Sequence, residues 1–463
     1  MMRKKGMRAL TSWLQLGLCA GIFAGPAVAT GESPALFIRG KRLILRPGEE
    51  LQDGAVLVRD GRIMAVGRDL RKPDDAREIE GAVVCAAYID AWGALGLGMD
   101  SLRDASTSAA TRTADGLDPW ADEHLRRETL RAGVTIVRVQ AGSDARVGGI
   151  GALVRVAPDL PPGEAIVLAD CSVAMSIGKA GAPDGEGRDP FERIADLDRV
   201  VSAVETGKTY LLARIEHRYD LEEWEKKIAE KEAELEKDAK KAKKDREKEQ
   251  KEAEEKDKPF QEKKYKEDKR PQPPRFDEDS EVLAQVANGG IPLLVQADRS
   301  AEIRGLLAGT AEHDRLRLVL AGGAGALRSS RILSERRVPV LLSLVPRGQD
   351  GTNDLGESSL SLAGDLARSG VQILLGTGGS NPAASRDLPL LTALAIGNGL
   401  DRSKAFESLT LGAARAFDAS GLLGTLEEGK EAEILVLDGE PLTAAASVRY
   451  VVTGGRLVVE PGS

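Results

Sequence analysis

Three histidines, His124, His217 and His313, are the only imidazole groups in this chain. Each lies among charged residues in a segment with helical composition, so we expect all three on the surface, away from strand ends. A site that needs four or more imidazoles is excluded. Two hydroxyl groups, those of Ser143 and Thr377, follow expected strands in small-residue loops, but neither has a histidine assigned beside it. A catalytic triad is therefore not predicted.

The composition limits the classes of partner. The chain has 463 residues, of which 42% are hydrophobic and 30% charged, enough to bury a core in two or three domains. Its net charge is −8 and only 3% of its residues are aromatic. A protein with neither a basic field nor a supply of stacking rings is poorly suited to nucleic acid, so we expect no nucleic-acid partner.

Residues 1–29 have the pattern of a signal peptide. Basic residues lie between positions 3 and 8, an apolar stretch runs from 10 to 24, and Ala27-Val28-Ala29 supplies the small residues of a cleavage site. An uncleaved membrane anchor is the alternative, but the apolar stretch is shorter than the ~20 residues that span a bilayer. We therefore expect an exported protein, periplasmic or extracellular, with no membrane span after cleavage.

Two cysteines, Cys85 and Cys171, remain in the mature chain. Two buried free thiols are the expected outcome. A disulfide between them is the alternative that an oxidising compartment allows.

Both ends of the mature chain are rich in short β-like runs. In the first, residues 35–81, the pair Asp60-Gly61 separates two such runs and predicts a hairpin turn, because both central residues need positive φ. The second spans residues 425–460. We expect the two segments to form one composite β-sandwich domain.

Between these ends, over residues 82–424, β-like runs alternate with helical stretches, which predicts repeated βα units and a parallel sheet. Eight such runs favour an α/β fold of the (β/α)8 TIM-barrel type. The fourth is the shortest, and its alternative is the opening of a helix. The glycine-rich segment 148–151 is interpreted as a tight loop, since nothing frames it as a dinucleotide fingerprint. The eight runs begin near Ala82, Val134, Ala165, Lys208, Ile291, Leu316, Val338 and Val371.

A charged segment, expected over residues 218–275, interrupts the barrel. From 220 to 270 it holds 18 Lys and Arg and 19 Asp and Glu in 51 residues, without glycine. This composition predicts a helix, and its few apolar residues do not continue as heptads. We interpret it as a solvated helical insertion; an arm that binds a protein partner is the alternative.

Four motifs, in this order, resemble the amidohydrolase superfamily, and in particular its imidazolonepropionase-like members. They are residues 53–67, Ile89-Asp90-Ala91, residues 132–135 and residues 429–433. The resemblance covers nearly the whole mature chain. It implies a (β/α)8 barrel with a small β domain, one or two divalent metals such as zinc at the barrel mouth, and hydrolysis of carbon–nitrogen bonds by a metal-bound hydroxide.

The same resemblance places the metal ligands on side chains that lack donor atoms. The His-x-His of the first strand becomes Trp92 and Ala94, and the last-strand aspartate becomes Gly378. The histidines of the fifth and sixth strands become Gln296 and Ala321. Of these five positions, only Gln296 keeps a donor, a single amide oxygen.

We therefore predict no metal site, no cofactor and no catalytic residue, and interpret the chain as a pseudoenzyme. Two alternatives remain: an active hydrolase with an atypical site, and a scaffold that binds a ligand or partner. The acid beside the lost ligands, Asp90, is expected to be structural. Trp92 is expected to close the barrel mouth, and a pocket beside Gln296 for a small, mostly apolar molecule is the alternative.

Overall fold

The computed structural model describes residues 35–97, 108–118, 120–141, 146–157, 160–177, 190–253, 269–344 and 361–462. Side chains are described for all of these except residues 162 and 238–253. The expected signal peptide and Ser143 lie outside the described residues.

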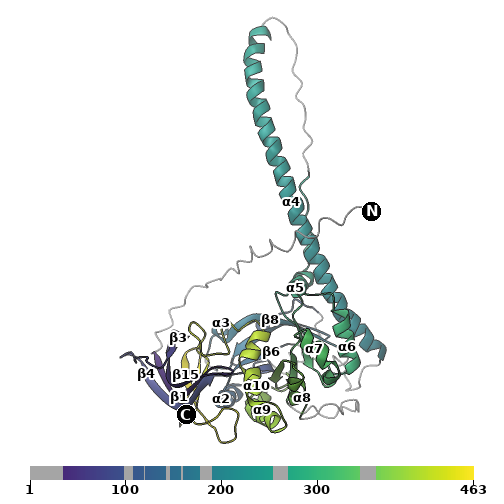
Figure 1. Cartoon of the computed structure of the whole chain (residues 1–463). Coiled ribbons are helices and arrows are strands. Elements are labelled where there is room, and N and C mark those ends of the chain that lie inside the picture. Colours follow the sequence, from purple (N-terminus) through teal and green to yellow (C-terminus); the bar gives the residue numbers. More distant parts are fainter. Residues whose placement is uncertain are drawn as a thin grey trace.

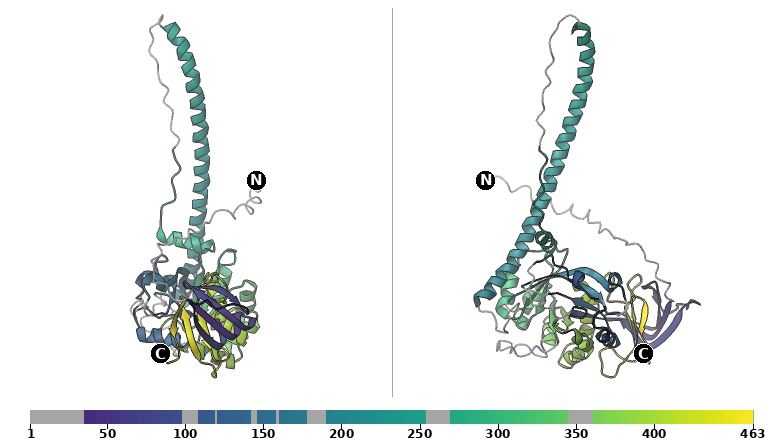
Figure 2. Two further views of the ribbon diagram at one scale, coloured as in Figure 1. Left: turned by 90° about the vertical axis from the view of Figure 1, so that its left-hand side faces the viewer. Right: turned by 180° about the vertical axis from the view of Figure 1, so that it is seen from behind.

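Seven strands from the two ends of the chain form one sheet, in the order β15-β14-β13-β4-β1-β2-β3. In Figure 2 the purple N-terminal strands and the yellow C-terminal strands lie side by side. The predicted composite β domain is thus confirmed, but its boundary is not: the run near Ala82 is the end of β4 in this sheet, and the first barrel strand begins at Tyr88. Its strands are β1 (Leu36–Arg46), β2 (Glu49–Arg59), β3 (Arg62–Gly67), β4 (Arg77–Ala86), β13 (Ile434–Leu437), β14 (Val448–Thr453) and β15 (Arg456–Val459).

The turn between β2 and β3 is the one that the sequence predicts. Asp60 and Gly61 have φ of 50° and 77°, and the flanking residues Arg59 and Arg62 are paired across the ladder. Positive φ at both positions matches the right-handed twist of the two strands.

Eight strands form the second sheet, in the order β12-β11-β10-β9-β8-β7-β6-β5. Its two outer strands meet where the backbone N–H groups of Thr377 and Gly379 donate to the carbonyl of Trp92, at 3.1 and 3.0 Å. This arrangement is the predicted TIM-like barrel. Its strands are β5 (Tyr88–Gly93), β6 (Val134–Val139), β7 (Val147–Arg155), β8 (Ile166–Ser176), β9 (Leu293–Ala297), β10 (Leu318–Gly322), β11 (Val340–Ser343) and β12 (Ile373–Gly376).

The strand expected near Lys208 is wrong, and so is the loop expected at residues 148–151. Lys208 lies inside a long helix, α4 (Pro190–Ala253), because Val200, Val204 and Gly207 recur at helical spacing and bury one face. The missing strand is β7, which runs antiparallel to both β6 and β8. The glycines of β7 weaken its strand signal in the sequence. Gly149 has a φ of 72°, and a Cβ there would come within 2.3 Å of the Thr111 carbonyl oxygen.

Shorter helices surround the barrel, and α11 packs with Phe417 into the apolar cluster of the barrel interior. The α-helices are α2 (Glu123–Arg131), α3 (Pro162–Ala165), α5 (Glu278–Ala287), α6 (Ser300–Gly309), α7 (Ser330–Glu335), α8 (Leu362–Arg368), α9 (Leu388–Gly397), α10 (Arg402–Leu409) and α11 (Leu411–Ala416). The 3₁₀ helices are η1 (Thr113–Gly116), η2 (Ala326–Ser329) and η4 (Pro382–Asp387).

Helix α4 has 64 residues, equivalent to about 96 Å of rise, and projects far beyond the barrel (Figure 1). Its first turns pack on α5 and α6. At Gly207 a Cβ would come within 2.1 Å of the Leu283 carbonyl oxygen, so the helices cross in close contact there. Among the described side chains of α4, none after Gly207 is buried. The predicted helical insertion is therefore the outer part of a helix that begins at Pro190, well before residue 218.

None of the described helices combines the length and the apolar character that crossing a membrane requires.

A buried ion pair joins the barrel to the composite sheet. Arg155 of β7 donates through Nε to Glu433 at 2.9 Å and through Nη2 to Glu431. The side chains of Arg155 and Glu433 are 10% and 4% exposed, so both charges are removed from water together. Removing either residue would leave the other charge buried without a partner. The pair therefore holds the two sheets in one relative position.

Candidate functional site

The carboxyl ends of the parallel barrel strands define the mouth where active sites of this fold lie. Trp92, Gln296 and Ala321 are the last or next-to-last residues of β5, β9 and β10, with Ala94 and Gly378 in the loops after β5 and β12. The four side chains at these positions are all buried. The sequence analysis thus assigned every one of these positions to a strand end.

Trp92 packs against the last strand. A Cβ added to Gly379 would lie 2.6 Å from the indole Nε1, and one added to Gly376 would lie 2.7 Å from the Trp92 Cβ. Trp92 is 3% exposed and shares one apolar cluster with Ala321, Leu341 and Leu374 of the barrel interior. The indole therefore fills space between β5 and β12 that only glycines leave open.

The five positions are not all brought together. Gln296 and Ala321 are neighbours on the β9–β10 ladder, and Ala321 shares its cluster with Trp92. Ala94 instead packs into the larger apolar cluster that includes Leu95 and Leu97.

Gly378 has a backbone conformation that aspartate would adopt only with strain. Its φ is 90°, and a Cβ there would lie 2.5 Å from the hydroxyl of Ser343. The loop after β12 is thus shaped around a residue without a side chain.

Asp90 is a fully buried acid of β5, two residues before Trp92, and its carboxylate accepts four hydrogen bonds. Its Oδ1 accepts from the backbone N–H of Trp92 at 3.0 Å and of Thr377 at 3.1 Å. Its Oδ2 accepts from the hydroxyls of Thr377 at 2.6 Å and Ser385 at 2.7 Å. Burial raises the pKa of this carboxyl, although these hydrogen bonds oppose the rise. The group holds β5 against β12, the structural role predicted from the sequence.

A fully buried arginine lies in the barrel interior. Arg138 of β6 donates through Nε and Nη2 to the Ser172 hydroxyl at 3.0 and 2.7 Å, and through Nη2 to Gln140 Oε1 at 2.8 Å. Its guanidinium lies 5.1 Å from the centre of the Phe417 ring. Gly151 leaves room for it, because a Cβ there would lie 3.0 Å from Nη2. Burial lowers the pKa of Arg138.

The histidines do not rebuild a metal site. His124 is exposed on α2 and lies 3.2 Å from Glu128, and His217 is half-buried on α4. The expectation for His313 is wrong: it lies in a turn rather than a helix, its side chain is 3% exposed, and its Nε2 is 3.0 Å from Glu205. Contact with α4 buries it. Across the described ranges, no three His, Cys, Asp or Glu side chains lie close enough to hold a metal ion.

The remaining candidate nucleophiles, one hydroxyl and two thiols, are hydrogen-bonded or buried. The hydroxyl of Thr377 donates to Asp90. Cys85 and Cys171 are free and buried in different sheets, and burial raises the pKa of both thiols. A thiol held in its neutral form is a poor nucleophile and a poor metal ligand.

The donor set at the mouth therefore does not fit a catalytic zinc ion. Such a site needs three protein ligands that supply lone pairs, and the indole, methyl and hydrogen side chains here supply none. The single amide of Gln296 is a weak ligand for zinc. No step of a hydrolytic mechanism can be built on these residues.

The structure shows a second feature that sequence reasoning missed, a hollow lined by arginines at the opposite end of the barrel. Its arginines precede β10 (Arg317), precede β11 (Arg336 and Arg337) and belong to α11 (Arg415). The signal was present in the sequence. Residues before neighbouring parallel strands share one edge of the sheet, just as residues after those strands do.

Comparison with known proteins supports the resemblance to amidohydrolases. Residues 377–459 match the model of the amidohydrolase family Amidohydro_3. Among solved structures, an amidohydrolase from Thermotoga maritima aligns with a TM-score of 0.68 at 20% identity, covering 92% of this chain and 100% of that one. The comparison with curated proteins gave no match.

Two further solved structures show the same fold at lower similarity. A prolidase complexed with N-methylphosphonate-L-proline aligns with a TM-score of 0.53 at 16% identity, over 92% of this chain and 100% of the other. The ochratoxinase of A. niger aligns with a TM-score of 0.51 at 14% identity, over 93% and 97%. At these identities the likeness shows the shared barrel fold alone.

Proposed function

We propose that this protein is an exported amidohydrolase-fold barrel that has lost metal-dependent hydrolysis of carbon–nitrogen bonds. The observation that carries the proposal is the packing of Trp92. Where an active relative would present the first histidine, an indole is buried against Gly376 and Gly379.

The chemistry at the mouth supports this proposal. Hydrolysis by this superfamily needs a metal that lowers the pKa of bound water, and a base that accepts its proton. Position 378 offers no carboxylate, and Asp90 already accepts four hydrogen bonds. The five ligand positions therefore do not provide the metal site, and neither position 378 nor Asp90 provides the base.

Export is proposed from the sequence of residues 1–29, with cleavage after Ala29. A periplasmic or extracellular protein without catalysis would act by binding.

The outer part of α4 favours a second candidate function, a scaffold for a protein partner. From Lys208 to Lys237 every described side chain is exposed or half-buried, so this stretch contributes nothing to the barrel core. Ordering a helix that extends this far from its domain costs conformational entropy, and the helix adds nothing to the core in return. A partner that binds along it would offset that cost.

Elemental analysis of the mature protein tests the main proposal. Protein without an affinity tag is incubated with excess zinc, desalted and analysed, and thermal unfolding is followed with and without EDTA. We expect well under one zinc ion per chain and an unchanged unfolding temperature. One or two tightly held zinc ions per chain, lost together with stability on chelation, would show that the pseudoenzyme assignment is wrong.

A further inference from the structure

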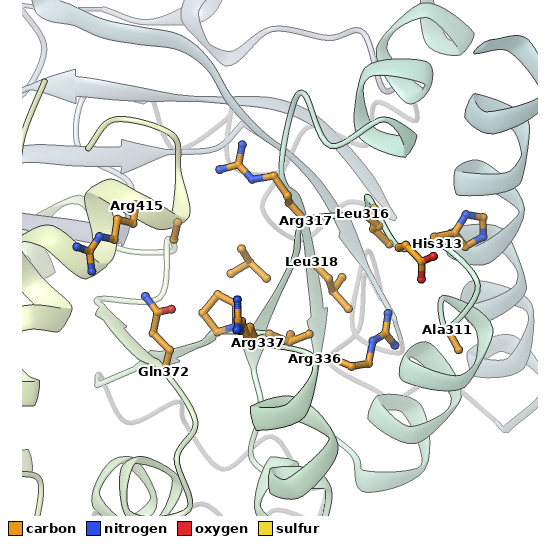
Figure 3. A pocket seen from close by; sticks show the side chains of 14 residues that line it. Ala311, His313, Leu316, Arg317, Leu318, Arg336, Arg337, Gln372 and Arg415 are labelled. Carbon is orange, nitrogen blue, oxygen red and sulfur yellow. The ribbon is translucent and has the colours of Figure 1, made fainter. Parts of the chain in front are cut away.

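The arginine-lined hollow at the amino-terminal edge of the barrel strands is separate from the mouth. Its volume is about 490 Å³, within the range of small-molecule sites. Figure 3 shows Arg337 between Gln372 and Arg336, with Arg317 and Arg415 on neighbouring elements. Four arginines from three separate segments therefore line one cavity in a protein whose net charge is −8.

The charge of this hollow is only partly balanced. Asp314 is the one acidic residue in its lining. Outside the lining, Asp418 lies 3.4 Å from Arg317, and Glu407 lies 4.0 Å from Arg415. Among the described residues, no ion pair involves Arg336 or Arg337. Two arginines of the lining therefore make no ion pair, although Asp314 of the same lining interacts electrostatically with Arg336.

Arg336 is fixed in place by the surrounding backbone. Its Nη2 donates to the Thr310 carbonyl at 2.9 Å, and its Nη1 donates to the Leu307 carbonyl at 2.5 Å. Burial lowers the pKa of this guanidinium, with Asp314 opposing the change. A cation held by neutral carbonyl groups in a partly buried position attracts an anion more strongly than a freely solvated one.

Arg337 occupies a position where glycine would be less strained. Its φ is 54°, and it follows the end of α7, where a left-handed residue is usually glycine or asparagine. A long cationic side chain at such a position places an exposed arginine at the edge of the cavity. The local backbone gains nothing from that side chain.

The lining also has an apolar part and an amide. Leu318, Val319, Val338 and Pro339 supply aliphatic surface, and Gln372 supplies one donor and one acceptor. Planar guanidinium groups bind the paired oxygens of phosphate or carboxylate in bidentate geometry. A ligand suited to this cavity is compact, carries two or more negative charges on oxyanion groups, and has a small neutral body.

We propose that this hollow binds a small polyanion of that class, a phosphorylated or polycarboxylic molecule. The site is independent of the barrel mouth, so it stands whether or not the protein hydrolyses a substrate. It gives the barrel a binding role at the end opposite to the lost metal site.

Titration calorimetry of the full mature chain tests the site with two probes, inorganic pyrophosphate and citrate. We expect saturable binding of at least one probe, weakened by added salt as ion pairing requires. Binding of pyrophosphate alone identifies a phosphorylated ligand, and binding of citrate alone a polycarboxylic one. Absence of saturable binding by either probe at low salt overturns the proposal.

Two variants with a matched control make the test specific. R337G and R415Q should each weaken binding by about tenfold, equivalent to about 1.4 kcal/mol. R331Q removes an arginine whose side chain is 85% exposed outside the cavity, and should leave the affinity unchanged. Equal weakening by all three would mean a nonspecific charge effect and would contradict the site.

The unfolding temperature of R337G shows whether this variant is folded in the binding measurements. Because glycine tolerates a φ of 54°, the variant should unfold at the same or a higher temperature than the wild type when no anion is present. Unchanged affinity in a folded R337G, together with unchanged affinity in R415Q, would remove both cations from the proposed site and overturn it.

Discussion

Thr377 donates two hydrogen bonds to the carboxylate of Asp90, one from its backbone N–H at 3.1 Å and one from its hydroxyl at 2.6 Å. These bonds join the first barrel strand in the chain to the loop after the last. The barrel is thus closed by a buried acid next to Trp92, one of the positions that the resemblance assigns to a metal ligand. Asp90 lies beside the expected metal ligands, but its contacts give it a structural role.

The first prediction concerns the charge on Asp90. Its pKa in the folded protein is raised above the ordinary 3.8, so the folded state holds the proton more tightly than the unfolded state does. The contribution of this group to stability is present at low pH and is lost as the pH rises from about 4 through the raised pKa. D90N keeps one oxygen for the two N–H groups, and its amide can donate to the two hydroxyls.

We therefore expect D90N to remove this fall in unfolding free energy and to equal or exceed the wild type at pH 7. D90A removes the acceptor of four hydrogen bonds; both Thr377 donors keep the Trp92 carbonyl, at 3.1 and 3.3 Å, but the Trp92 N–H and the Ser385 hydroxyl lose their acceptor. The variant should cost about 2–4 kcal/mol at every pH. Urea unfolding of the three proteins between about pH 4 and 7 measures both effects. A marked loss of stability in D90N at pH 7 would show that the negative charge itself is required.

The second prediction concerns the crossing of α4 and α5. In G207A the added methyl group would lie 2.1 Å from the Leu283 carbonyl oxygen, so the helices must separate. We expect a loss of about 1–3 kcal/mol in unfolding free energy. The control is G397A at the end of α9, where a Cβ meets nothing within 4 Å. G397A should be neutral or stabilising by up to about 1 kcal/mol, and a G207A protein as stable as G397A would contradict the close crossing.

The third prediction concerns the outer part of α4. Replacing residues 220–270 with a short Gly/Ser linker should leave the barrel folded, because no described side chain in this range is buried. The thermal unfolding midpoint should stay within a few degrees of the wild-type value. As a control, V200A and V204A shorten two side chains of α4 that are 1% and 0% exposed, and together should clearly destabilise the protein.

The deletion also separates the two candidate functions of the arm. If a bound protein is lost while cooperative unfolding is kept, the arm is an interaction surface. If the deleted protein unfolds without cooperativity, the outer helix contributes to the fold and the interpretation as a solvated insertion fails.

Local signals in the sequence predicted much of the fold, and tertiary contacts account for the failures. Asp60-Gly61 predicted its turn because positive φ is a local requirement. The run at Lys208 was ambiguous, because a short apolar run fits a strand or a buried helical face. In β7, Gly151 is explained only by the side chains of Arg138 and Gln140 that it accommodates.

In the candidate site, too, some features follow from the sequence and others depend on tertiary contacts. The five degenerate positions could be placed at strand ends, because the order of strands follows from the chain. The burial of His313 could not be predicted, since it depends on Glu205 of α4, more than a hundred residues earlier in the chain. In the arginine hollow, Arg317, Arg336 and Arg337 could be placed at one edge from the strand order, whereas Arg415 joins them only through the packing of α11.

The last prediction restores the metal site in steps. Gln296 and Ala321 are paired on the β9–β10 ladder, and Trp92 belongs to the same apolar cluster as Ala321. W92H/Q296H/A321H supplies three imidazoles, the number that a zinc ion needs. We expect this variant to gain zinc binding in calorimetry and elemental analysis, whereas the donor-free control W92F/Q296L/A321V should not. Adding G378D should lower the unfolding temperature without strengthening zinc binding, because φ there is 90° and the new Cβ would lie 2.5 Å from the Ser343 hydroxyl. If the triple-histidine protein folds but binds no zinc, these positions do not correspond to the metal ligands of active amidohydrolases. If G378D instead tightens zinc binding without loss of stability, the loop after β12 can adopt the geometry of a metal site, and the proposed loss of metal binding depends on the side chains alone.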